Sequence, residues 1–180
     1  MEANEVQELK EHAEQGAESA LRPVAFTMSL LAVMVAVTTV LGHRTHTEAV
    51  LNQNKATDQW NEYQAHKIRS NDTALASDLL SVVTISDKDA AAKIAKSYAD
   101  HQEKWAESTK EDKEKAEALE AKVEQAEVRA DRFDLAEALL EIGLVITSVT
   151  LLTRSRIYWY LGILFSIGGI ASALSVLMLK

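Results

Sequence analysis

The sequence predicts an all-α integral membrane protein with about three transmembrane helices and a long antiparallel helical hairpin, coiled-coil-like, that forms a stalk outside the bilayer. Apolar residues gather in three blocks, at residues 23–42, 135–152 and 157–179. Six Gly and one Pro in 180 residues favour long helices. The polar stretch between the first two blocks, residues 43–134, divides into two arms of similar length, as expected of a chain that leaves the membrane and returns.

Composition narrows the classes of function. The formal net charge of −8 argues against a nucleic-acid partner, because phosphate binding needs clustered Lys and Arg. The absence of Cys excludes disulfides and thiolate metal sites. The sequence has no Gly-rich phosphate loop, nucleophile elbow or zinc-protease pattern. We therefore predict that the protein is not an enzyme and takes no cofactor or metal.

Residues 1–22 form an acidic segment ahead of the first apolar block, with an apolar periodicity that predicts a short amphipathic helix. A secretory signal would need a basic start directly before its apolar core, so we expect an anchor that is retained. Residues 23–42 carry no formal charge, and their length matches the hydrocarbon core of a bilayer, about 30 Å thick. Pro23 suits the first turn of a helix, where its missing N–H costs nothing.

Residues 43–134 are expected to form the stalk hairpin and to turn near residue 86. Ser86 is a suitable N-cap for the second arm, while residues 70–73 prefer caps and turns and mark a weak point in the first. The second arm has a row of side chains at a spacing of seven, which a helix places on one stripe. Asp112 interrupts the row, which consists of Tyr98, Trp105, Asp112, Leu119, Ala126 and Phe133.

The last two apolar blocks are expected to form a transmembrane helical hairpin. Residues 135–152 and residues 157–179 are each long enough to cross a bilayer, and residues 153–156 between them can only form a tight turn. The third block begins with Tyr158, Trp159 and Tyr160, and such aromatic side chains favour the membrane–water interface.

The stretch from Leu51 to Lys67 contains the pattern Asp-x-Trp-x-x-Tyr-Gln-Ala-x-Lys. Together with the Thr-Arg-Ser-Arg turn and the Ile-Tyr-Trp-Tyr-Leu-Gly start of the last block, it resembles a family of small bacterial membrane proteins catalogued only as a domain of unknown function. The similarity covers nearly the whole chain. The resemblance implies a bacterial membrane protein with about three spans, and it implies no activity.

The localisation expected from this resemblance is the bacterial inner membrane. Lys and Arg in short loops mark the cytoplasmic side of a span. Arg22 and the Arg154–Arg156 turn fall on the same predicted side as the N-terminus. Basic residues on the stalk side oppose this assignment, but long loops cross the membrane largely regardless of charge. We therefore expect a cytoplasmic N-terminus and a periplasmic stalk.

Two acidic residues, Glu137 and Glu141, lie near the start of the second apolar block, four residues apart and so on one helix face. Acids within a span are expensive and usually face a protein interior or water. One interpretation is a ring of acids beside a cation or proton path in an oligomer. The other is that the headgroup zone accommodates both carboxylates, which fits Glu137 better than Glu141.

A second set of candidate residues lies on the stalk, where packing or partner binding would use them. Trp60 and Tyr63 are expected to dock against the second arm or a neighbouring subunit, with charged residues bonding at the rim. The full set is Asp58, Trp60, Tyr63, Gln64, Lys67, Tyr98, Trp105, Leu119 and Phe133.

Three functions fit these features. The first is a structural or scaffolding membrane protein that assembles as a homo-oligomer through its spans and stalk. The second is a pore-forming or transport-accessory oligomer with Glu141 near the pore. The third is a membrane-anchored sensor that binds a protein partner through its stalk. The lipid bilayer is a partner in all three.

Overall fold

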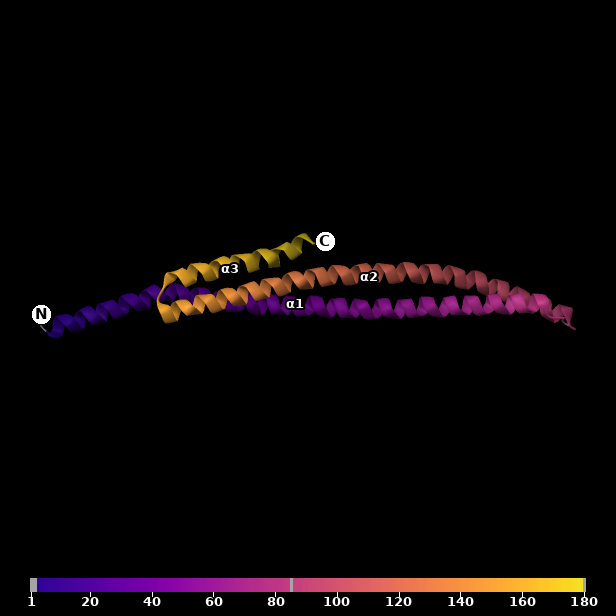
Figure 1. Ribbon diagram of the computed structural model, residues 1–180, viewed down its shortest axis with the longest axis horizontal. Coiled ribbons are helices and arrows are strands. Elements are labelled where there is room, and N and C mark those ends of the chain that lie inside the picture. Colours follow the sequence, from indigo (N-terminus) through magenta and orange to yellow (C-terminus); the bar gives the residue numbers. More distant parts are fainter. Residues whose placement is uncertain (1–2, 85, 180) are drawn as a thin grey trace. The chain divides into compact units, whose positions relative to one another are not determined.

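The computed structural model describes residues 3–84 and 86–179, with side chains from residue 21 onward (Figure 1). These residues form α1 (Ala3–Val82), α2 (Lys88–Thr153), α3 (Arg156–Ser175) and the short 3-10 helix η1 (Val176–Met178), without any strand in the described part of the chain. The three α-helices are long and apolar enough, by length and composition, to cross a membrane. The predicted all-α class is therefore confirmed. The amphipathic face expected of residues 1–22 lies almost wholly outside the described side chains.

The helix α1 is longer than its sequence signals indicate. Pro23 lies inside α1, not in a first turn as predicted, because α1 already begins at Ala3. A proline inside a helix cannot donate the backbone hydrogen bond to the carbonyl four residues earlier. The Pro23 carbonyl itself accepts a hydrogen bond from the Thr27 hydroxyl at 2.9 Å. The weak point expected at residues 70–73 is also absent, since α1 continues through it. The Thr73 hydroxyl donates to the Arg69 carbonyl at 2.8 Å, so this side chain bonds within the helix and does not end it.

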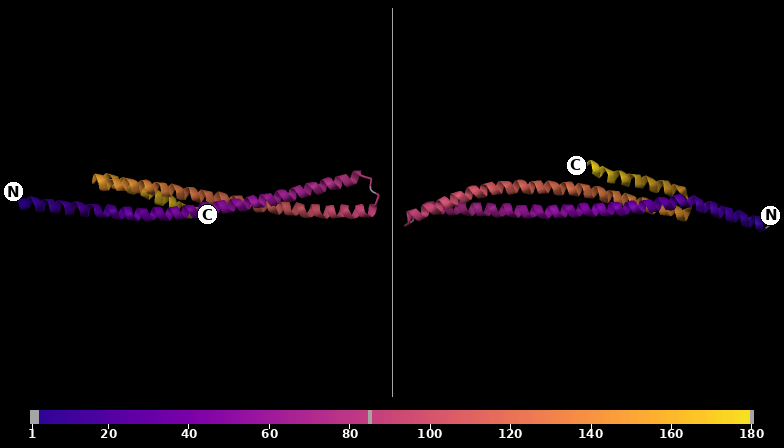
Figure 2. Two further views of the ribbon diagram at one scale, coloured as in Figure 1. Left: turned by 90° about the horizontal axis from the view of Figure 1, so that it is seen from below. Right: turned by 180° about the vertical axis from the view of Figure 1, so that it is seen from behind.

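The chain reverses between Val82 and Lys88, where Figure 2 shows the link from α1 to α2. Asp87, not the predicted Ser86, caps α2. Its Oδ1 accepts hydrogen bonds from the backbone N–H groups of Asp89 and Ala90, at 3.1 and 2.9 Å. Asp87 directly precedes the first helical residue, which is the position where a side-chain oxygen reaches these otherwise unpaired donors.

The chain divides into two compact units, one of residues 1–46 and 127–180, the other of residues 47–126. In the first unit, α3 packs on the end of α2 through small residues. A Cβ on Gly162 would clash with the Thr147 side chain and would lie 2.6 Å from the Gly143 carbonyl oxygen. A Cβ on Gly169 would lie 2.8 Å from the Ala136 carbonyl oxygen. Glycines that let two backbones approach this closely are typical of helix pairs in membranes.

The outer face of the first unit is covered with apolar side chains. Leu152, Ile157 and Leu164 expose 85%, 74% and 64% of their surfaces. Similar exposure is found at Phe26, Leu30, Val33, Val37, Val145, Ile167 and Leu174. Soluble monomers rarely expose apolar patches of this extent. Such a patch marks a surface that contacts another protein or a membrane.

In the second unit, the α1 and α2 segments run in opposite directions and lie side by side (Figures 1 and 2). The residues turned inward on α2 alternate at spacings of four and three: Asp112, Ala116, Leu119, Val123 and Ala126. The same alternation on α1 gives Ala49, Asn52, Ala56, Gln59, Tyr63, His66, Ser70 and Thr73. Most of the fully buried residues are alanines, so this core is narrow and gains little from apolar burial.

Candidate functional site: a polar network between α1 and α2

The most deeply buried charged side chain described is Asp112 on α2, which is only 4% exposed. Both of its carboxylate oxygens bond to side chains of α1. The Gln59 side-chain amide donates to Oδ1 at 3.0 Å, and His66 Nδ1 lies 2.7 Å from Oδ2. Because an ionised carboxylate is acceptor-only, the His66 ring donates from Nδ1 in this pair. Gln59 and His66 are seven residues apart, which brings both onto the α1 face that meets Asp112.

The polar network can fix the register of α1 against α2. A buried carboxylate without partners costs several kcal/mol, whereas charge-assisted hydrogen bonds offset much of that cost. Sliding one helix along the other would separate Asp112 from both donors. An apolar core of alanines resists such sliding poorly, since one alanine fits as well as the next. The network therefore selects one register, a known use of isolated polar groups between helices.

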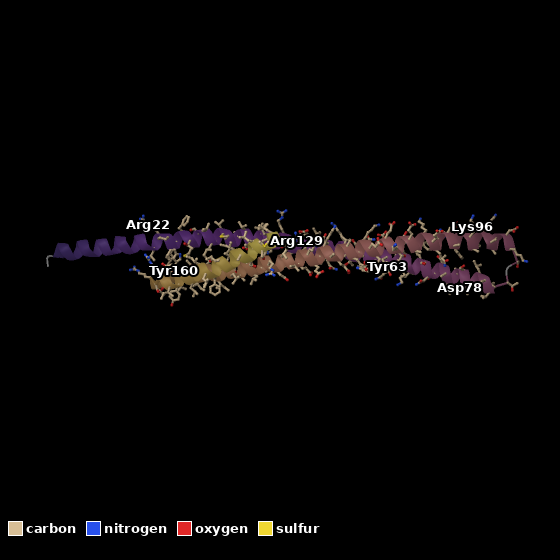
Figure 3. All side chains as sticks on the ribbon, turned by 90° about the horizontal axis from the view of Figure 1, so that it is seen from above. Arg22, Tyr63, Asp78, Lys96, Arg129 and Tyr160 are labelled. Carbon is tan, nitrogen blue, oxygen red and sulfur yellow. The ribbon has the colours of Figure 1, made fainter. Side chains whose placement is uncertain are left out.

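An aromatic cluster lies on α1 next to the network. The rings of Trp60 and Tyr63 meet edge to face, with centroids 5.4 Å apart. The Trp60 indole N–H donates to Glu120 on α2 at 2.8 Å, and the Lys67 ammonium lies 5.6 Å from the Tyr63 ring centroid. Figure 3 labels Tyr63 on this part of α1. The cluster thus adds a third polar bond between the two helices, at the edge of the core.

The other predicted stalk residues divide between the surface and the core. Asp58 and Gln64 are exposed, and neither belongs to the network. Tyr98, Trp105 and Leu119 are half-buried on α2, and His101 stacks on Trp105 with centroids 5.1 Å apart. Phe133, 8% exposed, belongs to the first unit.

The two candidate membrane acids have different surroundings within the first unit. Glu137 is half-buried, and its Oε1 accepts a 2.6 Å hydrogen bond from the Thr39 hydroxyl of α1. Glu141 is exposed. A second bond between the same helices joins His46 Nε2 to Asp134 at 3.0 Å. The structure therefore gives Glu137 a partner inside the chain, and it leaves Glu141 on the surface. No group of three metal-ligating side chains occurs in the described part of the chain.

Sequence reasoning missed Gln59 and His66. Both lie inside the stretch Leu51–Lys67, but they are polar residues beside the aromatics and fit no apolar stripe on this helix. The available signal was Asp112, an acid in an otherwise apolar row, because a buried acid requires donors on the facing arm. Counting back from the turn would have placed those donors near residues 59–66.

Comparisons with known proteins give one match. A family model described as a domain of unknown function, DUF4337, matches residues 20–179. No curated protein matches the chain, and no solved structure does. The match covers all three apolar blocks and all three residues of the polar network. The chain therefore belongs to the DUF4337 family, whose function is unknown.

Proposed function

We propose that this protein is a structural component of the bacterial inner membrane. In this proposal it crosses the bilayer three times and self-assembles through a helical hairpin stalk. The observation that carries self-assembly is a row of exposed apolar side chains at the far end of α1. These side chains are exposed although α2 is present, and the row begins at residue 68 of the second unit, whereas the first predicted span ends at residue 42.

Membrane insertion of the first unit is supported by its surface. Three helices have the length and composition of spans, and their apolar side chains point outward. The inward side chains include Thr38, Thr147 and Ser166, each bonded to a carbonyl of its own helix. Lipid is the solvent that matches such an arrangement, with small and polar residues between helices and apolar residues outside.

A continuous hairpin over residues 43–134 is supported by the spacing of the buried residues. The four-three alternation along both helices is the spacing of a coiled-coil seam. Polar bonds between α1 and α2 occur in the second unit at Trp60–Glu120 and in the first unit at His46–Asp134. The two residue numbers add to the same value in both pairs, as antiparallel helices require. We place the N-terminus in the cytoplasm and the stalk in the periplasm, because Arg154 and Arg156 lie in a short loop.

The exposed row consists of Ile68, Leu75, Leu79, Val82 and Val83, which are 54–78% exposed. Ile68, Leu75 and Val82 repeat at seven residues, so they share one helix face. We assign a second copy of this chain as the occupant. Copies anchored in one membrane hold their stalks at the same height, so each presents its row to the other at high effective concentration.

Replacing Leu75 and Leu79 together by Ser tests the assembly. Wild-type protein in mild detergent is expected to have a mass that is a multiple of the 19.8 kDa chain, and the double variant is expected to shift toward the monomer. Light scattering after size exclusion measures this mass. Val50→Ser/Leu51→Ser is the matched control, with 59% and 54% exposure on the same helix but far from the row. A wild-type protein that is monomeric at every concentration would refute self-assembly.

A pore-forming or transport-accessory oligomer is the second candidate, and the exposure of Glu141 favours it. The residue lies six positions after Leu135, about 9 Å into the apolar block at ~1.5 Å per residue. A carboxylate facing lipid at that depth is costly, so a neighbouring copy or a water-filled path would be expected to receive it.

Cation flux into vesicles carrying the reconstituted protein tests this second candidate. A pore predicts flux that falls several-fold in Glu141→Gln. The exposed stalk acid Glu114 provides the control, since Glu114→Gln is expected to leave the flux unchanged. Vesicles that remain impermeable with wild-type protein would exclude the pore.

A further inference from the structure

The turn between α2 and α3 has a backbone conformation that its sequence makes unfavourable. Arg154 has φ 54°, the left-handed region that Gly and Asn adopt most readily, and no other described non-Gly residue has a positive φ. A glycine would fit this position without strain. A residue other than Gly held in this region is often part of a functional site.

The guanidinium groups of this turn have no acidic partner in the described part of the first unit. Arg154 and Arg156 are both exposed, and neither forms a described ion pair. The nearest acid along α2 is Glu141, about 18 Å from Thr153 at ~1.5 Å per residue, and α3 contains no acid. Arg22 lies toward the same end of the unit, where Figure 3 labels it with Tyr160. Arg22 is four residues after Glu18, whose side chain is not described, so the site is confined to the turn.

Backbone and side-chain groups add further donors. Ser155, the N-cap of α3, makes no side-chain cap bond, so the first N–H groups of α3 stay open at the positive end of the helix dipole. Tyr158 and Tyr160 follow within the first turns, 39% and 60% exposed. The Trp159 indole N–H donates to the Thr27 hydroxyl at 3.2 Å, which fixes this end of α3 against α1.

Two of the most exposed apolar side chains flank the two arginines. Leu152 is 85% exposed and Ile157 is 74% exposed. A soluble phosphate ion would use the guanidinium groups but not these neighbours. A phospholipid uses both, because its phosphate and its acyl chains belong to one molecule.

We propose that the Arg154–Ser155–Arg156 turn binds the phosphate of an anionic phospholipid, with the acyl chains of that lipid against Leu152 and Ile157. Guanidinium groups hold phosphate oxygens in paired hydrogen bonds, and the start of α3 supplies backbone donors. The assignment rests on the membrane insertion proposed above and does not depend on self-assembly.

Native mass spectrometry of the full chain tests the site. The protein is released from micelles doped with equal amounts of phosphatidylglycerol and phosphatidylcholine, and the bound lipids are counted. Wild-type protein is expected to retain phosphatidylglycerol in preference to phosphatidylcholine by roughly tenfold or more, and Arg154→Gln/Arg156→Gln to lose most of that preference. The matched control is Arg129→Gln/Arg132→Gln, a second arginine pair in the first unit, which should keep it.

Three results would overturn the assignment: equal retention of both lipids by wild-type protein, an unchanged preference in the turn variant, or complete displacement of the lipid by millimolar inorganic phosphate. Alkaline extraction of membranes distinguishes the absence of the lipid site from the absence of membrane insertion. A protein that stays in extracted membranes but shows no lipid preference lacks the site. A protein that alkali releases was never inserted, and the site fails with it.

Discussion

Replacing Asp112 by Ala is expected to lower the free energy of unfolding of the second unit by about 2–4 kcal/mol. Asp112 is the only described side chain that ties both Gln59 and His66 to α2. Its removal leaves two half-buried donors without their acceptor and opens space in a core made largely of alanine. The effect is large relative to the small apolar area that holds this unit together.

Tryptophan fluorescence during urea unfolding of the full chain measures this loss. Trp60 and Trp105 lie in the second unit, so a Trp159→Phe background confines the signal to that unit. Glu114→Ala is the control, because Glu114 is exposed on the same helix. A double-mutant cycle with His66→Ala should give a coupling energy of about 1 kcal/mol or more. Additive effects of the two substitutions would show that the contact between His66 and Asp112 contributes no stability.

Replacing Gly162 by Ala is expected to destabilise the packing of α3 on α2 by about 1–3 kcal/mol. The added Cβ would lie 2.6 Å from the Gly143 carbonyl oxygen, so backbone must move to admit it. Gly168→Ala is a matched control in the same helix, since its Cβ would meet only the Leu139 side chain at 3.6 Å. Alanine raises helix propensity equally at both sites, so the difference between the variants isolates the clash.

Unfolding of the two glycine variants by sodium dodecyl sulfate in mixed micelles gives the comparison. The midpoint of Gly162→Ala should fall at a lower detergent fraction than that of Gly168→Ala. Equal midpoints would mean that α2 and α3 do not approach each other as closely as the structure has them.

Hydropathy and helix propensity made the all-α class and the three apolar helices predictable. The blocks of uncharged residues are unambiguous, and the near absence of Gly and Pro leaves few places for a helix to end. The hydropathy and the helix propensity of a segment depend only on residues close together in the sequence. The same reasoning placed Pro23 at a helix start, because it treated the helix predicted for the acidic segment as a separate one, whereas α1 runs from Ala3 through Pro23 without a break.

The polar network was harder to predict because its α1 members do not look like core residues. Asn52, Gln59, His66 and Ser70 interrupt any apolar stripe on α1, although they occupy the inward positions. The role of Gln59 and His66 depends on one residue of the facing helix, Asp112, which is more than 40 positions away in the chain. The cap of α2 shows the same limit on a small scale, since Ser86 and Asp87 are equally good cap residues and only the start of the helix decides between them.

The central claim of the proposed function is that the three apolar blocks of the first unit cross the membrane and that the second unit stands outside it. The chain has no Cys, so single cysteines can be introduced without a background. Asp78 and Lys96 mark the second unit in Figure 3, while Leu30 and Leu164 are exposed apolar positions of the first unit. A membrane-impermeant maleimide applied to intact spheroplasts is expected to label cysteine at 78 and 96, to label cysteine at 155 only after permeabilisation, and to leave 30 and 164 unlabelled in both. Labelling of 30 and 164 as fast as 78 would contradict the claim.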